Sequence, residues 1–259
     1  MNKLISAIFS AILCLTLVVT PKVMASNHKA SALDELISTY ERLGRFNGAV
    51  AIKKGNEVVY QRANGYANKQ VGTTNGVDKI FAIGSLSKQF TATAILLLVQ
   101  QEKLALNDPI AKHLPYYQNE VGNLVTIHHL LTHTAGIPDP MDTGAGIDGK
   151  NDPLMHEKTL SITKEKLILS FKDLPNDFAP GERHKYSNTG YVLLADIIER
   201  TSAMSYADFL QEFLFFPARM ENTSVQRPLK SKYLVESYNG IGEDKVHTTK
   251  IHNSWLIGA

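Results

Sequence analysis

The chain has 259 residues, of which 44% are hydrophobic and 20% charged, and its formal net charge is +2. These values are typical of a globular protein and exclude a disordered or fibrous chain. The length allows one large domain or two small ones.

The first 25 residues have the pattern of a secretory signal peptide. Lys3 gives a short basic start, residues 4–20 form an apolar run, and Val23 and Ala25 stand at plausible cleavage positions. We predict cleavage after Ala25, a periplasmic or secreted location, and a single mature domain over residues 26–259. The alternative is a membrane anchor, for which the apolar run is short.

Cleavage at this point would change the cysteine content and the charge. The only cysteine, Cys14, lies in the signal segment, so the mature chain would have no disulfide, thiolate nucleophile or cysteine metal site. The segment also holds two of the 27 basic residues and none of the 25 acidic ones, which leaves 25 of each sign. Nucleic-acid binding needs a basic face. We therefore expect no nucleic-acid partner and no stable membrane anchor.

The N-terminal part of the mature chain predicts a helix, a hairpin and a loop. Apolar residues recur at helical spacing over residues 31–43, and Gly44 ends this run. Residues 48–54 and 56–63 read as two strands that join at Gly55 and Asn56 in a β-hairpin. Residues 64–78 are polar and rich in glycine, which predicts a loop.

Residues 81–101 begin with polar side chains and continue as an almost wholly apolar run, which predicts a helix buried in the core. Ser85 at its start can be a helix N-cap or a nucleophile. A capping box would have Glu or Gln three residues later, and the sequence has Lys88 instead. The helix dipole and burial both disfavour the ammonium form of Lys88. A lysine inclined to release its proton, one turn away, can activate the Ser85 hydroxyl.

The remaining pattern is mainly helical, with helices expected over residues 126–134, 162–171, 191–201 and 206–215. Between the first two, a stretch to about residue 158 is rich in Gly, Asp and Pro and predicts a long loop, often a lid or substrate wall. A loop over residues 176–188 contains Tyr186 and Asn188. A phenol can relay protons for a Ser–Lys pair, and an amide can bind both the lysine and a substrate carbonyl. The alternative is a turn in which Asn188 only caps the next helix.

Three segments, GSLSKQF, LLTHTAGIPD and PGERHKYSNTGYVLLADIIER, resemble the serine β-lactamase and penicillin-binding protein superfamily. The resemblance runs from about residue 33 to residue 223 and favours the branch of class C β-lactamases, D-alanyl-D-alanine carboxypeptidases and esterases. It implies an α+β fold of the β-lactamase/transpeptidase type, with an antiparallel sheet and a mainly helical subdomain. It also implies roles for four residues. Ser85 would be the acylated nucleophile, with its backbone N–H in the oxyanion hole, and Lys88 would help to deprotonate it. Tyr186 would act as general base and acid, and Asn188 would bind Lys88 and the substrate amide.

Two departures from the family pattern qualify this expectation. A third motif, Lys/His-Thr/Ser/Gly-Gly on an inner strand, is not found after Asn188, and the closing strands of the sheet are also missing. Residues 217–220 read Pro-Ala-Arg-Met where relatives have Pro-Leu-Gly-Met, which is a packing change. We therefore expect a domain that is incomplete at its C-terminus.

The sequence thus predicts an exported serine hydrolase that forms an acyl-enzyme with a small β-lactam, a peptidoglycan-type D-alanyl peptide or a small ester. The alternative is a catalytically silent penicillin-binding or sensor module, or a truncated remnant. The oligomeric state is left open.

Other motifs do not point to a cofactor or a metal. Residues 144–149 match a dinucleotide-binding pattern by letter, but they do not follow a strand. His129 and His133 are four residues apart, but a Glu beside the first His and a third ligand are missing. We expect these histidines and His128 to serve packing and capping. We also expect no α/β-hydrolase elbow, because no Gly-x-Ser-x-Gly surrounds Ser85.

Overall fold

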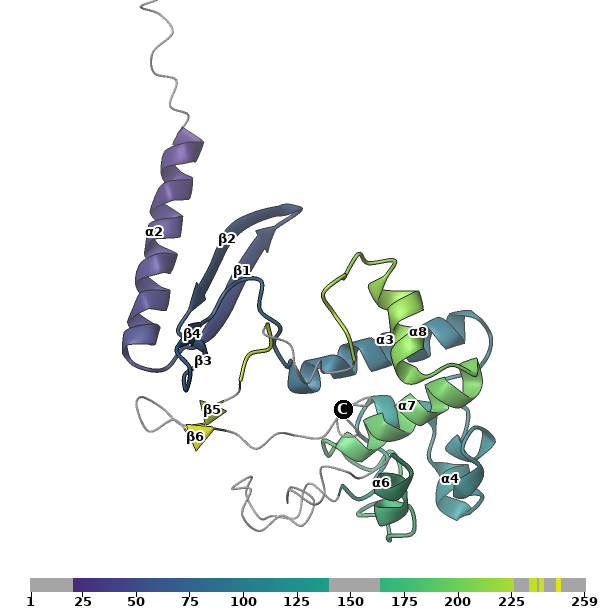
Figure 1. The fold of residues 1–259 in the computed structure, drawn as a ribbon. Helices are drawn as coiled ribbons and strands as arrows, with labels where there is room; N and C mark the ends of the chain where they lie inside the picture. The colour runs from purple at the N-terminus through teal and green to yellow at the C-terminus, as the bar shows by residue number, and fades with distance from the viewer. Residues whose placement is uncertain (1–20, 140–163, 226–232, 237, 240–245, 248–259) are drawn as a thin grey trace, which may run out of the picture. The chain divides into compact units, whose positions relative to one another are not determined.

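A computed structural model describes residues 21–139, 164–225, 233–236, 238–239 and 246–247 (Figure 1). The chain forms two compact units, the first from residues 1–79 and 233–248 and the second from residues 80–232 and 249–259. The apolar part of the predicted signal peptide, most of the predicted long loop and the glycine pattern at residues 144–149 lie outside the described residues. All four candidate site residues lie in the second unit.

The first unit contains the helix and the hairpin that the sequence predicts. Helix α2 (Pro21–Arg42) starts earlier than expected and ends just before Gly44, which has a φ of +64°. Strands β1 (Gly48–Lys54) and β2 (Glu57–Asn64) pair antiparallel, with Gly55 in the turn at a φ of +61°. The predicted hairpin is confirmed.

The prediction of a loop over residues 64–78 is wrong in part. Strands β3 (Tyr66–Asn68) and β4 (Thr73–Thr74) form a short antiparallel pair there. Its start is held by the Asn47 amide, which accepts from the Tyr66 N–H at 2.6 Å and donates to the Tyr66 carbonyl at 3.0 Å. A tertiary contact of this kind leaves no hydrophobic period in the sequence. Strands β5 (Tyr238–Asn239) and β6 (Val246–His247) form another short pair in this unit.

Polar contacts join α2 to the hairpin. Asp34 accepts from the Tyr60 hydroxyl and from Arg62, both at 2.9 Å. At the C-terminal end of α2, Glu41 accepts from the Asn64 side chain and from the Gly65 N–H. These contacts fix α2 along β2, which is the strand nearer to it in Figure 1.

Where the structure describes it, the second unit is built from helices and short helical turns. The α-helices of this unit are α3 (Lys88–Gln100), α4 (Glu120–Leu124), α5 (Ile127–Leu131), α6 (Lys164–Phe171), α7 (Asn188–Ser202) and α8 (Tyr206–Leu210). Tighter turns cover Gly84–Ser87, Ile110–Lys112 and Pro115–Tyr117, and a π-helical turn, Gln211–Phe215, continues α8. The sequence therefore predicts every long helix here, and it misses α4, which is only five residues long.

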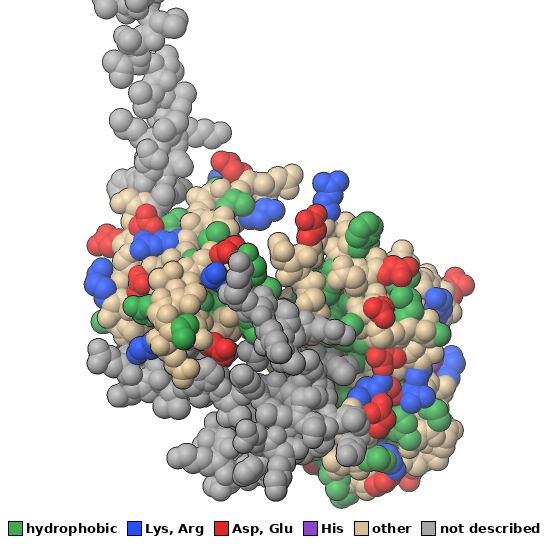
Figure 2. All heavy atoms as spheres, in the orientation of Figure 1, with side chains coloured by type: hydrophobic (Ala, Val, Ile, Leu, Met, Phe, Trp, Pro, Cys, Tyr) green, Lys and Arg blue, Asp and Glu red, His purple; other side chains and the backbone are tan. Residues whose placement is uncertain are grey.

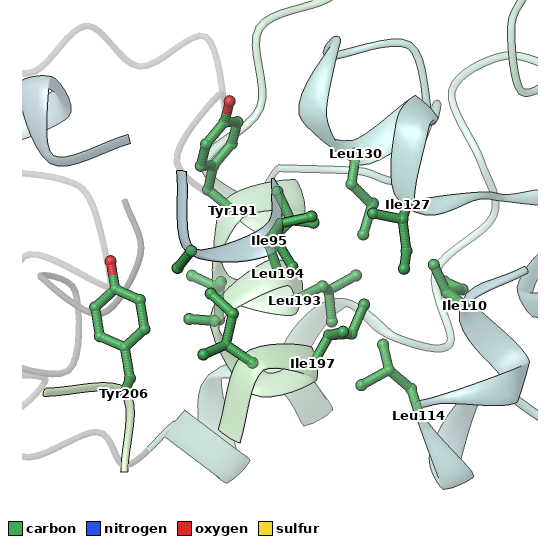
Figure 3. Close-up of a cluster of buried hydrophobic side chains, with 14 of the residues drawn as sticks. Ile95, Ile110, Leu114, Ile127, Leu130, Tyr191, Leu193, Leu194, Ile197 and Tyr206 are labelled. Atoms are coloured by element: carbon green, nitrogen blue, oxygen red, sulfur yellow. The ribbon is translucent and has the colours of Figure 1, made fainter. Parts of the chain in front are cut away.

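Helix α7 is the centre of the core of this unit (Figure 3). Its side chains Leu193, Leu194 and Ile197 are fully buried and pack with Ile95 of α3 and Leu130 of α5. The prediction that α3 is buried on every side is only partly correct, because Leu96 is half exposed. The core fixes α3 and α7 beside each other, and both helices begin at the candidate site.

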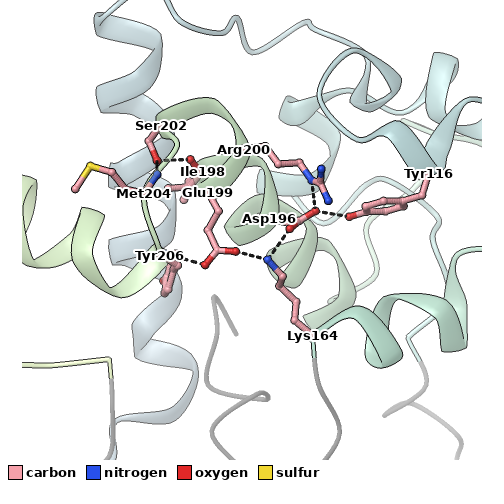
Figure 4. A network of polar contacts seen from close by, with 9 residues as sticks. All are labelled: Tyr116, Lys164, Asp196, Ile198, Glu199, Arg200, Ser202, Met204 and Tyr206. Atoms are coloured by element: carbon pink, nitrogen blue, oxygen red, sulfur yellow. Dashed lines mark hydrogen bonds and ion pairs between the residues drawn. The ribbon is translucent and has the colours of Figure 1, made fainter.

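A buried polar network ties α6 to α7 (Figure 4). Asp196 of α7 is 2% exposed and accepts from the Tyr116 hydroxyl at 2.8 Å, from Arg200 at 2.7 Å and from Lys164 at 2.6 Å. Lys164, the first residue of α6, also pairs with Glu199. The network satisfies a carboxylate that would otherwise be costly to bury.

Acidic and basic side chains are mixed over the face of the molecule seen in Figure 2. Among the described residues, none of the helices combines the length and the apolar composition needed to cross a bilayer. The longest, α2, is rich in polar residues.

Candidate active site

Ser85 and Lys88 are placed by a tight turn that leads into α3. Gly84 has a φ of +55°, a conformation that favours glycine, and the chain then makes one 3₁₀ turn before α3 begins. The N-cap position of α3 is Ser87 rather than Ser85. The interpretation of Ser85 as the helix cap is therefore wrong. Its side chain is exposed, whereas Lys88, one turn later, is only 7% exposed.

Asn188 lies at the start of α7, where Ser187 provides the cap. The Ser187 hydroxyl accepts from the Gly190 N–H at 3.1 Å. The Asn188 side chain does not cap the helix, so this alternative is also wrong. Its Oδ1 instead accepts from Lys88 Nζ at 2.9 Å. The tertiary structure thus pairs the Asn188 amide with Lys88.

Lys88 and Tyr186 both contact the Ser85 hydroxyl, and Asn188 joins the site through its contact with Lys88. Lys88 Nζ donates to Ser85 Oγ at 3.3 Å, and the Tyr186 hydroxyl donates to the same oxygen at 2.7 Å. Ser85 and Tyr186 are 101 residues apart in the sequence. Two proton-carrying groups therefore face one exposed hydroxyl, which is the arrangement that nucleophilic catalysis by serine needs.

Lys88 has neutral partners among the described residues. Besides Ser85 and Asn188, its Nζ lies 4.9 Å from the ring centroid of Tyr186 and 5.4 Å from that of Tyr191. The Tyr191 hydroxyl donates to the Leu131 carbonyl at 3.1 Å. Burial and the nearby Tyr186 raise the pKa of Tyr191, so this phenol keeps its proton. Tyr186 is thus the phenol that can exchange a proton with Ser85.

Two further residues, neither of them predicted to have this role, hold the start of α7. The buried Asp139 accepts from the Asn188 N–H through Oδ2 at 2.5 Å. His133 accepts from the Ser187 N–H through Nδ1 at 3.2 Å. Both belong to LLTHTAGIPD, one of the segments that carry the family resemblance, but only the tertiary structure shows what they contact.

Gly136 lets this segment pass close to its neighbour. Its φ is +74°, and a Cβ at this position would lie 2.1 Å from the carbonyl oxygen of Phe178. Only glycine fits such an approach. The close crossing brings the segment that ends at Asp139 to the start of α7.

His129 has a local role, as expected. Its Nδ1 accepts from the Thr126 N–H at 3.2 Å, and the Thr126 hydroxyl accepts from the His129 N–H, which together form a capping box for α5. Within the part of the chain that the structure describes, no three His, Cys, Asp or Glu residues are grouped so as to hold a metal ion.

Known proteins match this chain over most of its length. The model of the family described as Beta-lactamase matches residues 33–250. Penicillin-binding protein 4* of Bacillus subtilis is 35% identical over 212 residues, which is 82% of this chain and 45% of that protein. This chain thus spans less than half the length of the curated relatives it matches.

Solved structures show the same fold. A penicillin-binding protein from Bacillus halodurans is 28% identical, with a TM-score of 0.69 over 86% of this chain and 66% of that one. A class C beta-lactamase at 23% identity has a TM-score of 0.70 over 88% of this chain and 59% of that one, and its likeness concerns the fold alone. The predicted fold class is confirmed.

Proposed function

Because this chain belongs to the β-lactamase family, we propose that it is a serine hydrolase that forms an acyl-enzyme on Ser85. The observation that carries the proposal is the convergence of Lys88 and Tyr186 on one exposed serine hydroxyl, with Asn188 holding Lys88 in place.

In the acylation step, Ser85 Oγ attacks the substrate carbonyl carbon while its proton moves to a base. Two atoms lie within hydrogen-bond distance of Oγ, the Tyr186 oxygen at 2.7 Å and Lys88 Nζ at 3.3 Å. The shorter contact favours Tyr186 as the acceptor once its phenol has released its own proton to solvent, and the positive charge of Lys88, 4.9 Å from the ring centroid, stabilises the resulting phenolate. The proton then passes to the leaving group, which departs as the acyl-Ser85 bond remains.

Asn188 and the backbone of Ser85 orient the substrate. Since Asn188 Oδ1 accepts from Lys88, the NH₂ group of the same amide is left as a donor for a substrate carbonyl. The Ser85 N–H lies in the first turn of a helical segment, where backbone N–H groups lack intrahelical acceptors. It is suited to stabilise the oxyanion of the tetrahedral intermediate.

The substrate is a β-lactam, a D-alanyl peptide or a small ester. The name of the Bacillus subtilis relative, which refers to penicillin binding, favours a β-lactam as the acyl donor.

The signal-like segment at residues 1–25 supports export to the periplasm or the medium. Fractionation of expressing cells, with N-terminal sequencing of the exported form, tests this; a first residue other than Ser26 would place the cleavage elsewhere.

The central experiment is intact-mass measurement after incubation with a penicillin or a fluorophosphonate. We expect an adduct on the wild type and none on Ser85→Ala. Ser87→Ala is the matched control, because Ser87 lies two residues away and its hydroxyl donates to the Gly84 carbonyl. An adduct on Ser85→Ala, or none on folded wild type, would contradict the proposal. A stable adduct without product release would favour the second candidate, a penicillin-binding module without turnover.

A further inference from the structure

His133 holds the backbone on both sides of Tyr186. Its carbonyl oxygen accepts from the Lys185 N–H at 2.9 Å, and its Nδ1 accepts from the Ser187 N–H at 3.2 Å. Its ring also stacks on the Tyr186 ring at 4.7 Å between centroids, with an interplanar angle of 32°. His133 therefore fixes both the backbone and the ring of Tyr186.

The Ser187 contact defines the protonation state of the imidazole. A nitrogen that accepts a hydrogen bond needs a free lone pair, whereas both nitrogens of a protonated histidine are donors. Protonation of His133 would turn Nδ1 into a donor that faces the Ser187 N–H. The contact exists only with the neutral ring that carries its proton on Nε2.

Charged groups around the His133 ring shift its protonation equilibrium. Burial lowers the pKa of His133, and the charges of Lys88 on α3 and of the neighbouring His184 lower it further; the backbone of Ser187 and the charge of Asp139 act in the opposite direction without cancelling this shift. The His184 ring lies 5.8 Å away and the Tyr191 ring of α7 lies 5.1 Å away.

A small cavity beside His133 is also lined by Asp139, Tyr186 and an ion pair. This pair joins Lys185 and Asp177 at 2.8 Å, so its charges largely offset each other. The balance around the ring favours the neutral imidazole at pH 7.

We propose that His133, as a neutral imidazole, is a positioning residue that sets the Tyr186 hydroxyl against Ser85. The proposal rests on the proposed function of the Ser85 site. It predicts that acid weakens acylation by protonating His133, which releases Ser187 and places a second positive charge near Lys88. Since the pKa of His133 is lowered from 6.5, this loss begins below pH 6.5 and grows as the pH falls through the lowered value.

Two substitutions separate the acceptor from the rest of the side chain. His133→Asn keeps an acceptor near the position of Nδ1, cannot be protonated at this pH, and tolerates the φ of +58° at this residue. His133→Leu has a similar size and no acceptor, and it is also strained at this φ, so its loss of stability is measured beside its loss of rate. We expect the rate of labelling by a fluorophosphonate at pH 7.5 to fall by about 10- to 100-fold in His133→Leu, because a small misplacement of a catalytic group has this effect. His133→Asn should restore most of that rate.

The pH profile adds a readout that a structural role alone would not change. Relative to wild type, His133→Asn should lose the decline in labelling rate between pH 7 and 5. His184→Asn is the matched control, because this exposed histidine touches the same ring without holding Ser187, and it should keep the decline. An unchanged decline in His133→Asn, or equal losses in His133→Asn and His133→Leu, would overturn the proposal.

Hydrogen exchange tests the same proposal without any chemistry at Ser85. The Ser187 amide should be protected in wild type and in His133→Asn and should exchange faster in His133→Leu. If wild type takes no label but shows this pattern, the hydrolase proposal fails and the positioning role stands. If Ser187 exchanges alike in all three proteins, the positioning role fails whatever the labelling shows.

Discussion

Replacement of Asp196 by alanine should destabilise the helical unit strongly. The carboxylate is 2% exposed and accepts hydrogen bonds from Tyr116, Lys164 and Arg200 (Figure 4). Breaking a buried ion pair by removing one partner costs about 3–5 kcal/mol. The lower end applies here, because Lys164 keeps Glu199 and the Arg200 side chain is 43% exposed and can turn to water.

We therefore expect the free energy of unfolding to fall by about 3 kcal/mol, and a hydrogen bond from Tyr116 to a charged group accounts for about 1.5–3 kcal/mol of this. At this chain length the melting temperature should drop by about 6–12 °C. Urea unfolding at pH 7, followed by circular dichroism of the helices, measures the first quantity. Asp173→Ala is the matched control. Its carboxylate pairs with Lys172 but is 73% exposed, and exposed pairs contribute at most about 1 kcal/mol.

The effect should depend on pH in a defined direction. Burial alone would raise the pKa of Asp196, but the hydrogen bonds from Arg200, Lys164 and Tyr116 outweigh it, and the pKa is lowered from 3.8. The stabilisation is thus complete well above pH 3.8 and disappears as the pH falls through the lowered value. A difference between wild type and Asp196→Ala that is no larger than that for Asp173→Ala, or that grows towards pH 3, would refute this reasoning.

Three further substitutions test the packing around the site by the same unfolding assay. Gly136→Ala should destabilise by at least about 1–3 kcal/mol and reduce labelling of Ser85, because its Cβ would lie 2.1 Å from the Phe178 carbonyl oxygen and its φ is +74°. Thr126→Ala removes the cap of α5 and should cost about 1 kcal/mol; Thr126→Ser, which keeps the hydroxyl, should cost less. Leu194→Ala in the buried core should cost about 2–5 kcal/mol.

Each of these expectations has an outcome that contradicts it. A fully stable Gly136→Ala would show that the segment can shift away from its neighbour. Equal stability of Thr126→Ser and Thr126→Ala would show that the hydroxyl does not act as a cap. Leu96→Ala is the control for Leu194→Ala, since Leu96 is half exposed on α3. Equal costs for the two would contradict the observed burial pattern.

The sequence by itself determined the hairpin, the positions of the long helices and the identity of the four residues that meet at the site. Hydrophobic periodicity and turn residues are local signals, so they predict helices and hairpins without knowledge of the tertiary structure. The pairing of Ser85 with Lys88 is of the same kind, because a spacing of three residues on a helical segment already places two side chains together. The local sequence pattern did not predict strands β3 and β4, because their start is held by Asn47 from another part of the chain.

Only the tertiary structure decided what each polar residue of the site contacts. The local pattern offered Ser85 and Asn188 as helix caps, but Ser87 occupies the cap position of α3 and Ser187 caps α7, so both residues are left for Lys88. The role of His133 was likewise hidden, because its contacts to Lys185 and Ser187 join segments more than 50 residues apart. A hydrogen bond between distant segments depends on core packing, here the packing of α7 against α3 and α5. The polar residues that this packing brings together carry no sequence pattern that would predict the contact.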